Sequence, residues 1–319
     1  MDLKVEPPKS KKKKKKKNTM LSEETIQKVL AGNQLTMEDL TPEERKLFQR
    51  AVASGELSKL IAPWNPWWLK PSARTISFRH DGTQHVVPIN NEQEMENSQE
   101  ANAESPLSEI PCGPTTPLSR VDELIRSEPS PLISVHLIDI LFSYCFTMRL
   151  YNGDWQSDAL GSAITVLDIS SVLSQDGKLE TVAEALACCT EQVCSPTYRH
   201  TGGLQFAWAL VDDVITLLSL GRAALVCALC DLQRLLQAGE RELKSEAQRK
   251  VKKGEMSKLK LADRKVYFLT CWVNEQPAET WSALSAVVGV ERASVAVLEP
   301  MKRVEKGEVK GKALIEEVQ

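Results

Sequence analysis

The sequence from Val135 to Tyr151, VHLIDILFSYCFTMRLY, places its large apolar residues at the spacing of an α-helix. Ile138, Leu141 and Cys145 recur every three or four residues and therefore share one face. Similar stretches follow at 155–173, 179–193, 204–220 and 222–236, and glycines separate several of them. A charged helix is expected at 240–253, and further helices at 261–274 and 279–298. This pattern predicts an all-α fold, an antiparallel helical array or bundle of roughly seven or eight helices.

Changes in composition predict five regions. Residues 1–20 form a basic tail that repels itself and is expected to be disordered. Residues 21–72 form a small helical module that ends in a segment rich in Trp and Pro. Residues 73–130 form a Pro-rich and acidic linker, in which a short hairpin around Asp81-Gly82 is one alternative. The helical array occupies 131–300, and 301–319 form a C-terminal tail.

The helical module contains a clear helix start at Thr41-Pro42-Glu43-Glu44. Threonine is a good N-cap, proline is tolerated at the first helical position, and a glutamate three residues after the cap completes a capping box. The helix that follows is expected to end at Ser54-Gly55.

The charge of the chain is unevenly distributed. The net charge is −3, yet residues 1–20 carry +7 and the remainder carries −10, which argues against a body that wraps nucleic acid. Asp, Arg or Glu interrupts every apolar run that approaches membrane-spanning length, and the N-terminus has no apolar signal region. The eight scattered cysteines are typical of a reducing compartment. We therefore expect a protein of the nucleus, the cytoplasm or both, with no membrane partner.

The candidate binding residues lie in the run Pro63-Trp64-Asn65-Pro66-Trp67-Trp68, which holds three of the seven tryptophans. Two prolines prevent this run from being the middle of a helix or a central strand. The rings either clasp the domain that carries them or anchor a partner protein. Our site prediction is the second alternative, and its residues are Trp64, Pro66, Trp67 and Trp68.

A second candidate site is the unbroken lysine run near the N-terminus. Such a run is typical of a nuclear-import signal or a phosphate-binding tail, and the alternative is a solvated tail without a specific role. The residues are Lys11, Lys12, Lys13, Lys14, Lys15, Lys16 and Lys17.

We predict no catalytic residue, because the sequence lacks a phosphate-binding loop, a nucleophile elbow and a His-Glu-x-x-His helix. Cys227-Ala-Leu-Cys230 has the spacing of a metal or redox site, but it lies inside an apolar helical stretch. Cys188, Cys189, Cys194 and His200 are an alternative zinc set, although only one ligand pair is regular. Packed core cysteines are the preferred interpretation, with no metal and no cofactor.

RNA binding is the alternative function. It would use the lysine run and the helix expected at 241–265, where ten Lys and Arg are interleaved with Glu and Asp. A solvated helix with i,i+4 ion pairs explains this segment better, because the aromatic residues typical of single-strand binders are missing there.

Several motifs together resemble the zinc finger HIT domain-containing protein 2 family. They are Thr41-Pro-Glu-Glu-Arg-Lys-Leu-Phe, Leu57 to Trp68 with its Pro-Trp-x-Pro-Trp-Trp core, Ser130-Pro-Leu-Ile with the helix after it, Cys271-Trp-Val-Asn-Glu and Leu314-Ile-Glu-Glu-Val. The resemblance covers roughly residues 38–319.

The resemblance implies a non-enzymatic adaptor or scaffold. Its partners would be RuvB-like AAA+ ATPases and their co-chaperones, together with assembly factors of ribonucleoproteins such as snRNPs and snoRNPs. Members of that family carry an N-terminal zinc finger of eight Cys and His ligands. This chain has no Cys before Cys112 and no His before His80, so no zinc ligand is carried over.

Overall fold

The computed structural model describes residues 22, 25, 27, 37–53, 64–78, 110–174, 178–246 and 253–294. The regular secondary structure of these residues is helical, apart from one bridge residue at Phe78, which confirms the predicted all-α fold class. The chain divides into two compact units, Met1–Lys46 and Leu47–Gln319. The predicted basic tail, the hairpin at Asp81-Gly82 and the C-terminal tail lie outside the described residues.

The predicted capping box at the start of α2 (Pro42–Ala53) is confirmed. The Glu44 amide donates to Thr41 Oγ1 at 3.3 Å, and the Thr41 amide donates to Glu44 Oε2 at 2.8 Å. A 3-10 turn, η1 (Met37–Asp39), precedes the helix, and Arg45 Nη2 donates to the Met37 carbonyl at 2.8 Å. Local sequence therefore determines where α2 begins.

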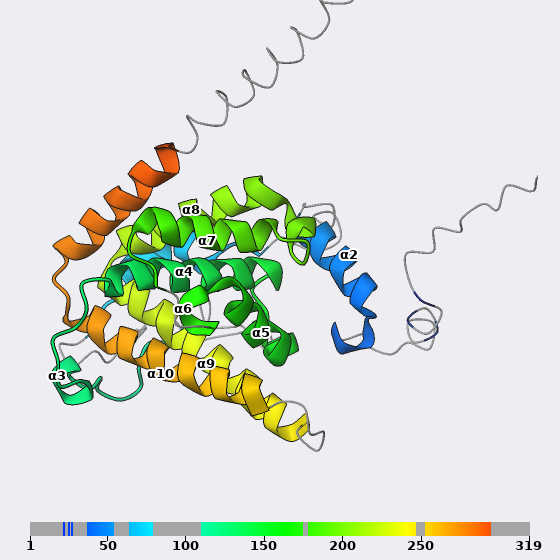
Figure 1. Cartoon of the computed structure of the whole chain (residues 1–319), viewed down its shortest axis with the longest axis horizontal. Helices are drawn as coiled ribbons and strands as arrows, with labels where there is room; N and C mark the ends of the chain where they lie inside the picture. Colours follow the sequence, from blue (N-terminus) through cyan, green and yellow to red (C-terminus); the bar gives the residue numbers. More distant parts are fainter. Residues whose placement is uncertain are drawn as a thin grey trace, which may run out of the picture. The chain divides into compact units, whose positions relative to one another are not determined.

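The second unit is a stack of helices that follow one another along the chain (Figure 1). Its elements are η2 (Trp67–Leu69), η3 (Pro71–Thr75), α3 (Val121–Leu124), α4 (Ile133–Leu150), η5 (Trp155–Asp158), α5 (Ala159–Ile169), α6 (Ser171–Ser174), α7 (Val182–Cys194), η6 (Arg199–Thr201), α8 (Gly203–Leu220), α9 (Arg222–Glu246), α10 (Lys253–Glu275) and a helix over 279–294.

Helix α4 is the centre of the core. It lies among the surrounding helices and packs against α5, α7, α8 and α9 (Figure 1). Its side chains are buried on nearly every side. A helix that is apolar all round is the kind that a protein buries completely, in contrast to the amphipathic helices around it. Helices α9 and α10 form a long pair beside it, and α5 packs on α9.

One predicted boundary is wrong, because α9 runs from Arg222 to Glu246 without the break expected after residue 236. Gly239 lies inside this helix. A Cβ at Gly239 would come 2.4 Å from the Cβ of Ala163, so the missing side chain lets α9 approach α5 closely. Gly202 and Gly221 do end helices as predicted, with φ of 129° and 80°.

The single helix expected at 155–173 is also wrong, since it is divided into η5, α5 and α6. Asp158 caps α5 by accepting from the Gly161 amide at 2.9 Å. Asp139, completely buried on α4, accepts from the Ser170 hydroxyl and from the amides of Ser171 and Val172. These carboxylates fix new helix starts that the apolar pattern alone does not reveal.

Helices α4 and α8 are long and apolar enough to cross a membrane by length and composition alone, which the sequence analysis did not expect. Both helices belong to the second unit, and 83% of α4 and 44% of α8 are buried within the protein. Each also carries an aspartate, Asp139 or Asp213, that is held by hydrogen bonds inside the unit. A core helix passes the same test of length and composition.

Candidate functional site

The tryptophan run lies against the C-terminal end of α4. The Trp64 amide donates to Oδ1 of Asn152 at 2.8 Å. The adjacent Gly153 has a φ of 84°, and a Cβ there would come 2.3 Å from Nε1 of the Trp64 indole. Both the left-handed backbone and the close approach of the ring require glycine at this position.

Trp67 is held by a chain of buried hydrogen bonds. Its Nε1 donates to the Tyr144 hydroxyl at 3.1 Å, and that hydroxyl donates to Oδ2 of Asp231 on α9 at 2.9 Å. Burial raises the pKa of Tyr144 well above its ordinary value, and burial also raises the pKa of Asp231. These two hydrogen bonds link the tryptophan run to α4 and α9.

Trp68 is bound in the same way to α8. Its Nε1 donates to Oδ1 of Asp213 at 3.0 Å, and Arg149 of α4 forms a two-nitrogen ion pair with the same carboxylate. The indoles of Trp64 and Trp68 meet edge to face, with ring centroids 5.3 Å apart. Such pairs add to the stabilisation from burial. We call residues Trp64–Leu69 and their partners the clasp.

Most of the predicted anchor residues are buried within the clasp. Trp67 and Trp68 are 2% and 1% exposed, Pro66 is buried, and only Trp64 is half-buried. The structure therefore favours the alternative in which the run holds its own domain together, while partner binding through Trp64 stays a prediction. The lysine run Lys11–Lys17 lies outside the described residues.

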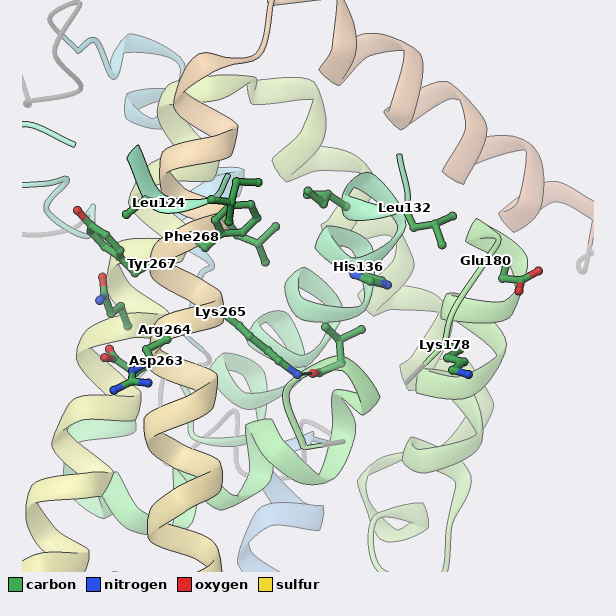
Figure 2. Close-up of a pocket in the computed structure, with 15 residues that line it drawn as sticks. Leu124, Leu132, His136, Lys178, Glu180, Asp263, Arg264, Lys265, Tyr267 and Phe268 are labelled. Carbon is green, nitrogen blue, oxygen red and sulfur yellow. Dashed lines mark hydrogen bonds between the residues drawn. The ribbon is translucent and has the colours of Figure 1, made fainter. Parts of the chain in front are cut away.

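A different surface has the shape of a binding site. It is a groove of about 910 Å³ between α3, the start of α4, α6, the 178–180 segment and α10, with one residue from α9 (Figure 2). Its walls are mostly aliphatic and aromatic. The apolar lining residues are Leu124, Ile125, Leu132, Ile133, Val172, Phe268 and Leu269. We call this surface the groove.

Tethers to α10 hold the walls of the groove in place. The hydroxyls of Ser119 and Tyr267 are 3.0 Å apart, and the Val121 amide donates to Oε1 of Glu275 at 2.8 Å, so the segment with α3 is bound to α10. On the opposite wall, Nζ of Lys265 donates to the Val172 carbonyl at 2.7 Å and fastens α6 to α10. Figure 2 shows Lys265 reaching across the groove.

The rim of the groove is charged. Asp263 accepts from Nε2 of Gln237 at 2.9 Å, and Lys265 is occupied by α6. Lys178 and Arg264 are exposed, and within the described part of the chain neither side chain has a hydrogen bond or an ion pair. Glu180 is the exposed acidic residue of the rim. The rim therefore carries three cations and two carboxylates, of which Lys178, Arg264 and Glu180 are exposed.

His136 and Lys265 lie among the apolar residues that line the groove. Burial lowers the pKa of His136 below its ordinary value; the charge of Asp139 opposes this shift and that of Lys265 adds to it. The lining holds no Ser or Cys for the histidine to activate. Because most of the lining is aliphatic or aromatic and Lys265 is fixed by its hydrogen bond to α6, the groove is suited to hold apolar side chains of a ligand.

The cysteines of the two candidate metal sets occupy different positions. Cys227, Cys230 and Cys189 are buried, and burial raises the pKa of each, that of Cys230 to about 12. Cys189 donates its thiol hydrogen to Asp139, whereas Cys194 is exposed. The described residues contain no group of three or more Cys, His, Asp or Glu that could hold a metal ion.

The segment proposed for RNA binding is divided between two helices. Its described residues belong to the end of α9 and to α10, and 247–252 lie outside the described residues. Lys244 pairs with Glu240 at 2.8 Å, and Lys265 faces α6 rather than solvent. Part of the positive charge is thus used within the protein.

Sequence reasoning missed the groove, because its lining comes from stretches as far apart as Leu124 and Leu269. One signal was available: α10 carries Phe268 within one helical turn of the charged run Asp263-Arg264-Lys265.

Comparison with known families identifies one matching domain. Residues 116–244 match the model of "SHQ1 protein, Shq1 domain", a segment that extends from α3 to near the end of α9. The clasp residues 64–69 and all of α10 lie outside this match. No solved structure matches the chain significantly.

Curated relatives agree with the family model. A protein SHQ1 homolog of Caenorhabditis elegans is 36% identical over 112 residues, which is 34% of this chain and 25% of the relative. Homologs from Xenopus tropicalis and Mus musculus are each 30% identical over 105 residues, a third of this chain and 16% and 17% of the relatives. The chain thus aligns with a quarter or less of the length of each of these relatives.

These matches correct the resemblance to the zinc finger HIT domain-containing protein 2 family, which is wrong. Of the motifs that suggested it, only Ser130-Pro-Leu-Ile and its helix lie within the matched residues. Short capped helices and a Trp-Pro clasp serve the packing of this domain and do not identify a family. The central part of the chain, residues 116–244, is similar to the Shq1 domain and to SHQ1 homologs.

Proposed function

We propose that this chain is a non-enzymatic adaptor that holds an apolar segment of a partner protein in the groove. The observation that carries the proposal is an open volume of about 910 Å³ lined mainly by aliphatic and aromatic side chains. Burying one large apolar side chain of a partner contributes about 1.5–3 kcal/mol. A few anchors of this kind supply most of the affinity of a protein interface.

The partners of such an adaptor are proteins of larger assemblies. RuvB-like AAA+ ATPases with their co-chaperones, and ribonucleoprotein assembly factors, entered as expected partners through a resemblance that is wrong. They are candidates for the capture experiment below, and no residue of this chain points to them specifically.

Within the residues that the structure describes, no observation favours RNA binding. A salt titration separates RNA binding from protein binding. Affinity that depends on phosphate contacts falls steeply as salt rises, because counterions are released from the nucleic acid. Binding of an apolar segment in the groove changes little between 50 and 200 mM salt, on the order of a few-fold.

The lysine run remains a proposed nuclear-import signal. A fluorescent fusion of the full chain should concentrate in the nucleus, and replacing all seven residues Lys11–Lys17 by Gln should distribute it evenly. Unchanged nuclear signal in that variant would show that the run is a solvated tail.

The capture experiment compares two single substitutions in the purified full chain. Phe268→Glu places a charge in the groove, and Val290→Glu places the same charge on the helix at 279–294, where Val290 is 64% exposed and does not line the groove. Proteins captured by the wild type should be lost with Phe268→Glu and kept with Val290→Glu.

Titration of the identified partner, in purified form, then gives the affinity. We expect Phe268→Glu to weaken it by at least roughly 10-fold, since one buried apolar side chain is worth more than 1.4 kcal/mol. Equal affinity of the wild type and Phe268→Glu would reject the groove as the binding surface.

A further inference from the structure

The end of the chain has the chemistry that the groove accepts. Residues 313–318 read Ala-Leu-Ile-Glu-Glu-Val, so three large apolar residues flank two adjacent carboxylates. Elsewhere in the 301–319 tail the apolar residues are single and separated by Lys, Glu or Gly. Leu314, Ile315 and Val318 are therefore the concentrated apolar group of this tail.

The charges of this segment match those of the rim. Glu316 and Glu317 are complementary to Lys178 and Arg264, which have no ion pair among the described residues. Lys312, which precedes the segment, is complementary to Glu180 on the same rim. An apolar peptide with one cation and two carboxylates thus faces a groove with three cations and two carboxylates, so the two net charges are opposite.

The length of the chain allows the contact. Ser294 is the last described residue, and Leu314 follows 20 positions later. A connection of this length spans at most about 66 Å. The described part of the second unit has about 200 residues, and a folded chain of this size has a radius of gyration of about 16 Å. The connection is several times longer than this radius, so its length allows the segment to reach the groove of its own unit.

We propose that residues 313–318 of this chain dock in the groove, with Leu314, Ile315 and Val318 on the apolar floor. Glu316 and Glu317 then meet Lys178 and Arg264. A tethered segment has an effective concentration in the millimolar range, so a weak intrinsic affinity is enough to occupy the groove part of the time.

The consequence is competition with the partner proposed above, and in this respect the inference rests on the proposed function. A partner with higher affinity displaces the segment, and the apparent affinity of the partner is its intrinsic affinity multiplied by the fraction of chains in which the groove is free. The segment thereby selects against weak partners without a separate inhibitor.

A peptide-binding experiment on the purified chain tests the docking without any partner. The probe is a fluorescein-labelled synthetic peptide of residues 310–319, followed by fluorescence anisotropy. The receptor is the full chain with Leu314→Asp and Ile315→Asp, which leaves the described residues unchanged. We expect binding with a dissociation constant between about 0.05 and 1 mM, and at least 3-fold weaker binding to the wild-type chain, because its own segment competes.

A charge exchange locates the contact. Arg264 is exposed, so Arg264→Glu should fold normally, and far-UV circular dichroism verifies this. In the receptor background this substitution should weaken the wild-type peptide at least 3-fold. A peptide with Glu316→Lys and Glu317→Lys should bind that variant better than it binds the unmodified receptor. Phe268→Glu should remove binding of both peptides, and Val290→Glu should change neither.

Three outcomes would overturn the inference: no binding of the peptide up to 2 mM, binding that Phe268→Glu leaves intact, or equal affinity for the receptor and the wild-type chain.

Light scattering distinguishes docking within one chain from docking in a second copy. A monomer at all concentrations is expected, and a dimer that the Leu314→Asp and Ile315→Asp substitutions dissolve would assign the segment to a second copy. The adaptor proposal fails differently, when a captured partner is insensitive to Phe268→Glu.

Discussion

The clasp and the groove use aromatic residues in opposite ways. In the clasp, the indole N–H groups of Trp67 and Trp68 are each bound to a buried partner, and the rings are 2% and 1% exposed. In the groove, Phe268 and Leu132 are half-buried and border an open volume. Satisfied polar atoms and full burial belong to a structural role, whereas open apolar walls are what a ligand needs.

The difference also concerns which parts of the molecule each region connects. The clasp joins a segment at residues 64–69 to α4, α8 and α9 through Tyr144, Asp213 and Asp231. The groove lies where α10 meets α3, α4 and α6. Damage to the clasp should therefore be measured as lost stability, and damage to the groove as lost binding.

The largest expected effect on stability is that of Trp68→Ala. It removes a fully buried indole and its hydrogen bond to Asp213, and such substitutions cost about 3–5 kcal/mol in the free energy of unfolding. Urea denaturation followed by circular dichroism measures this. If the free energy of unfolding were unchanged while partner capture were lost, the run would be an anchor after all.

The next prediction compares the stability losses caused by two glycine substitutions. It separates the cost of backbone strain from the cost of the collision with Trp64. Gly203→Ala serves as the control, because Gly203 has a φ of 59° and nothing lies within 4 Å of a Cβ placed there. It should cost about 1–2 kcal/mol. Gly153→Ala has the same kind of backbone strain and in addition collides with the indole, so it should cost about 1–3 kcal/mol more than the control. Equal losses in thermal unfolding would mean that Trp64 moves aside freely.

A smaller effect concerns the pH dependence of stability. Burial raises the pKa of Asp231 above its ordinary value, so the folded chain binds this proton more tightly than the unfolded chain. The contribution of Asp231 is therefore fully present below about pH 4 and is lost as the pH rises through the raised pKa. Asp231→Asn, which still accepts from Tyr144, should reduce the decline of the free energy of unfolding between about pH 4 and pH 7. If the wild type and Asp231→Asn had the same dependence of the free energy of unfolding on pH, this prediction would be refuted. Burial also raises the pKa of Asp139, so Asp139 should account for part of the pH dependence that remains in Asp231→Asn.

The smallest expected effect on stability is that of Phe268→Glu. Because Phe268 is half-buried and packs at the edge of an open volume, the free energy of unfolding should fall by about 1 kcal/mol or less. Denaturation of this variant beside Trp68→Ala therefore gives the sharpest contrast between the two regions. A loss as large as that of Trp68→Ala would make the groove part of the core.

Much of the fold was predictable from local signals. The capping box at Thr41 and Glu44, the glycines that end α8 and precede it, and the apolar period of α4 each act within a few residues. The predictions that failed depend on contacts over long distances in the sequence. Gly239 is required by Ala163, and the start of α6 is set by Asp139, more than 30 residues before it.

The candidate site was harder to predict for the same reason. The tryptophan run was conspicuous in the sequence, and its two alternatives differed only in what covers the rings, which is a property of the packed chain. The groove is formed by side chains from Leu124 to Leu269 that no motif unites. Residues such as His136 and Lys265 acquire their positions only when α4, α6 and α10 meet.

The most direct test of this account is the affinity of the full chain for its purified partner, measured with Phe268→Glu and with Val290→Glu. The account predicts that Phe268→Glu, although folded, binds at least roughly 10-fold more weakly, and that Val290→Glu binds like the wild type. A folded Phe268→Glu chain that binds with unchanged affinity would contradict it.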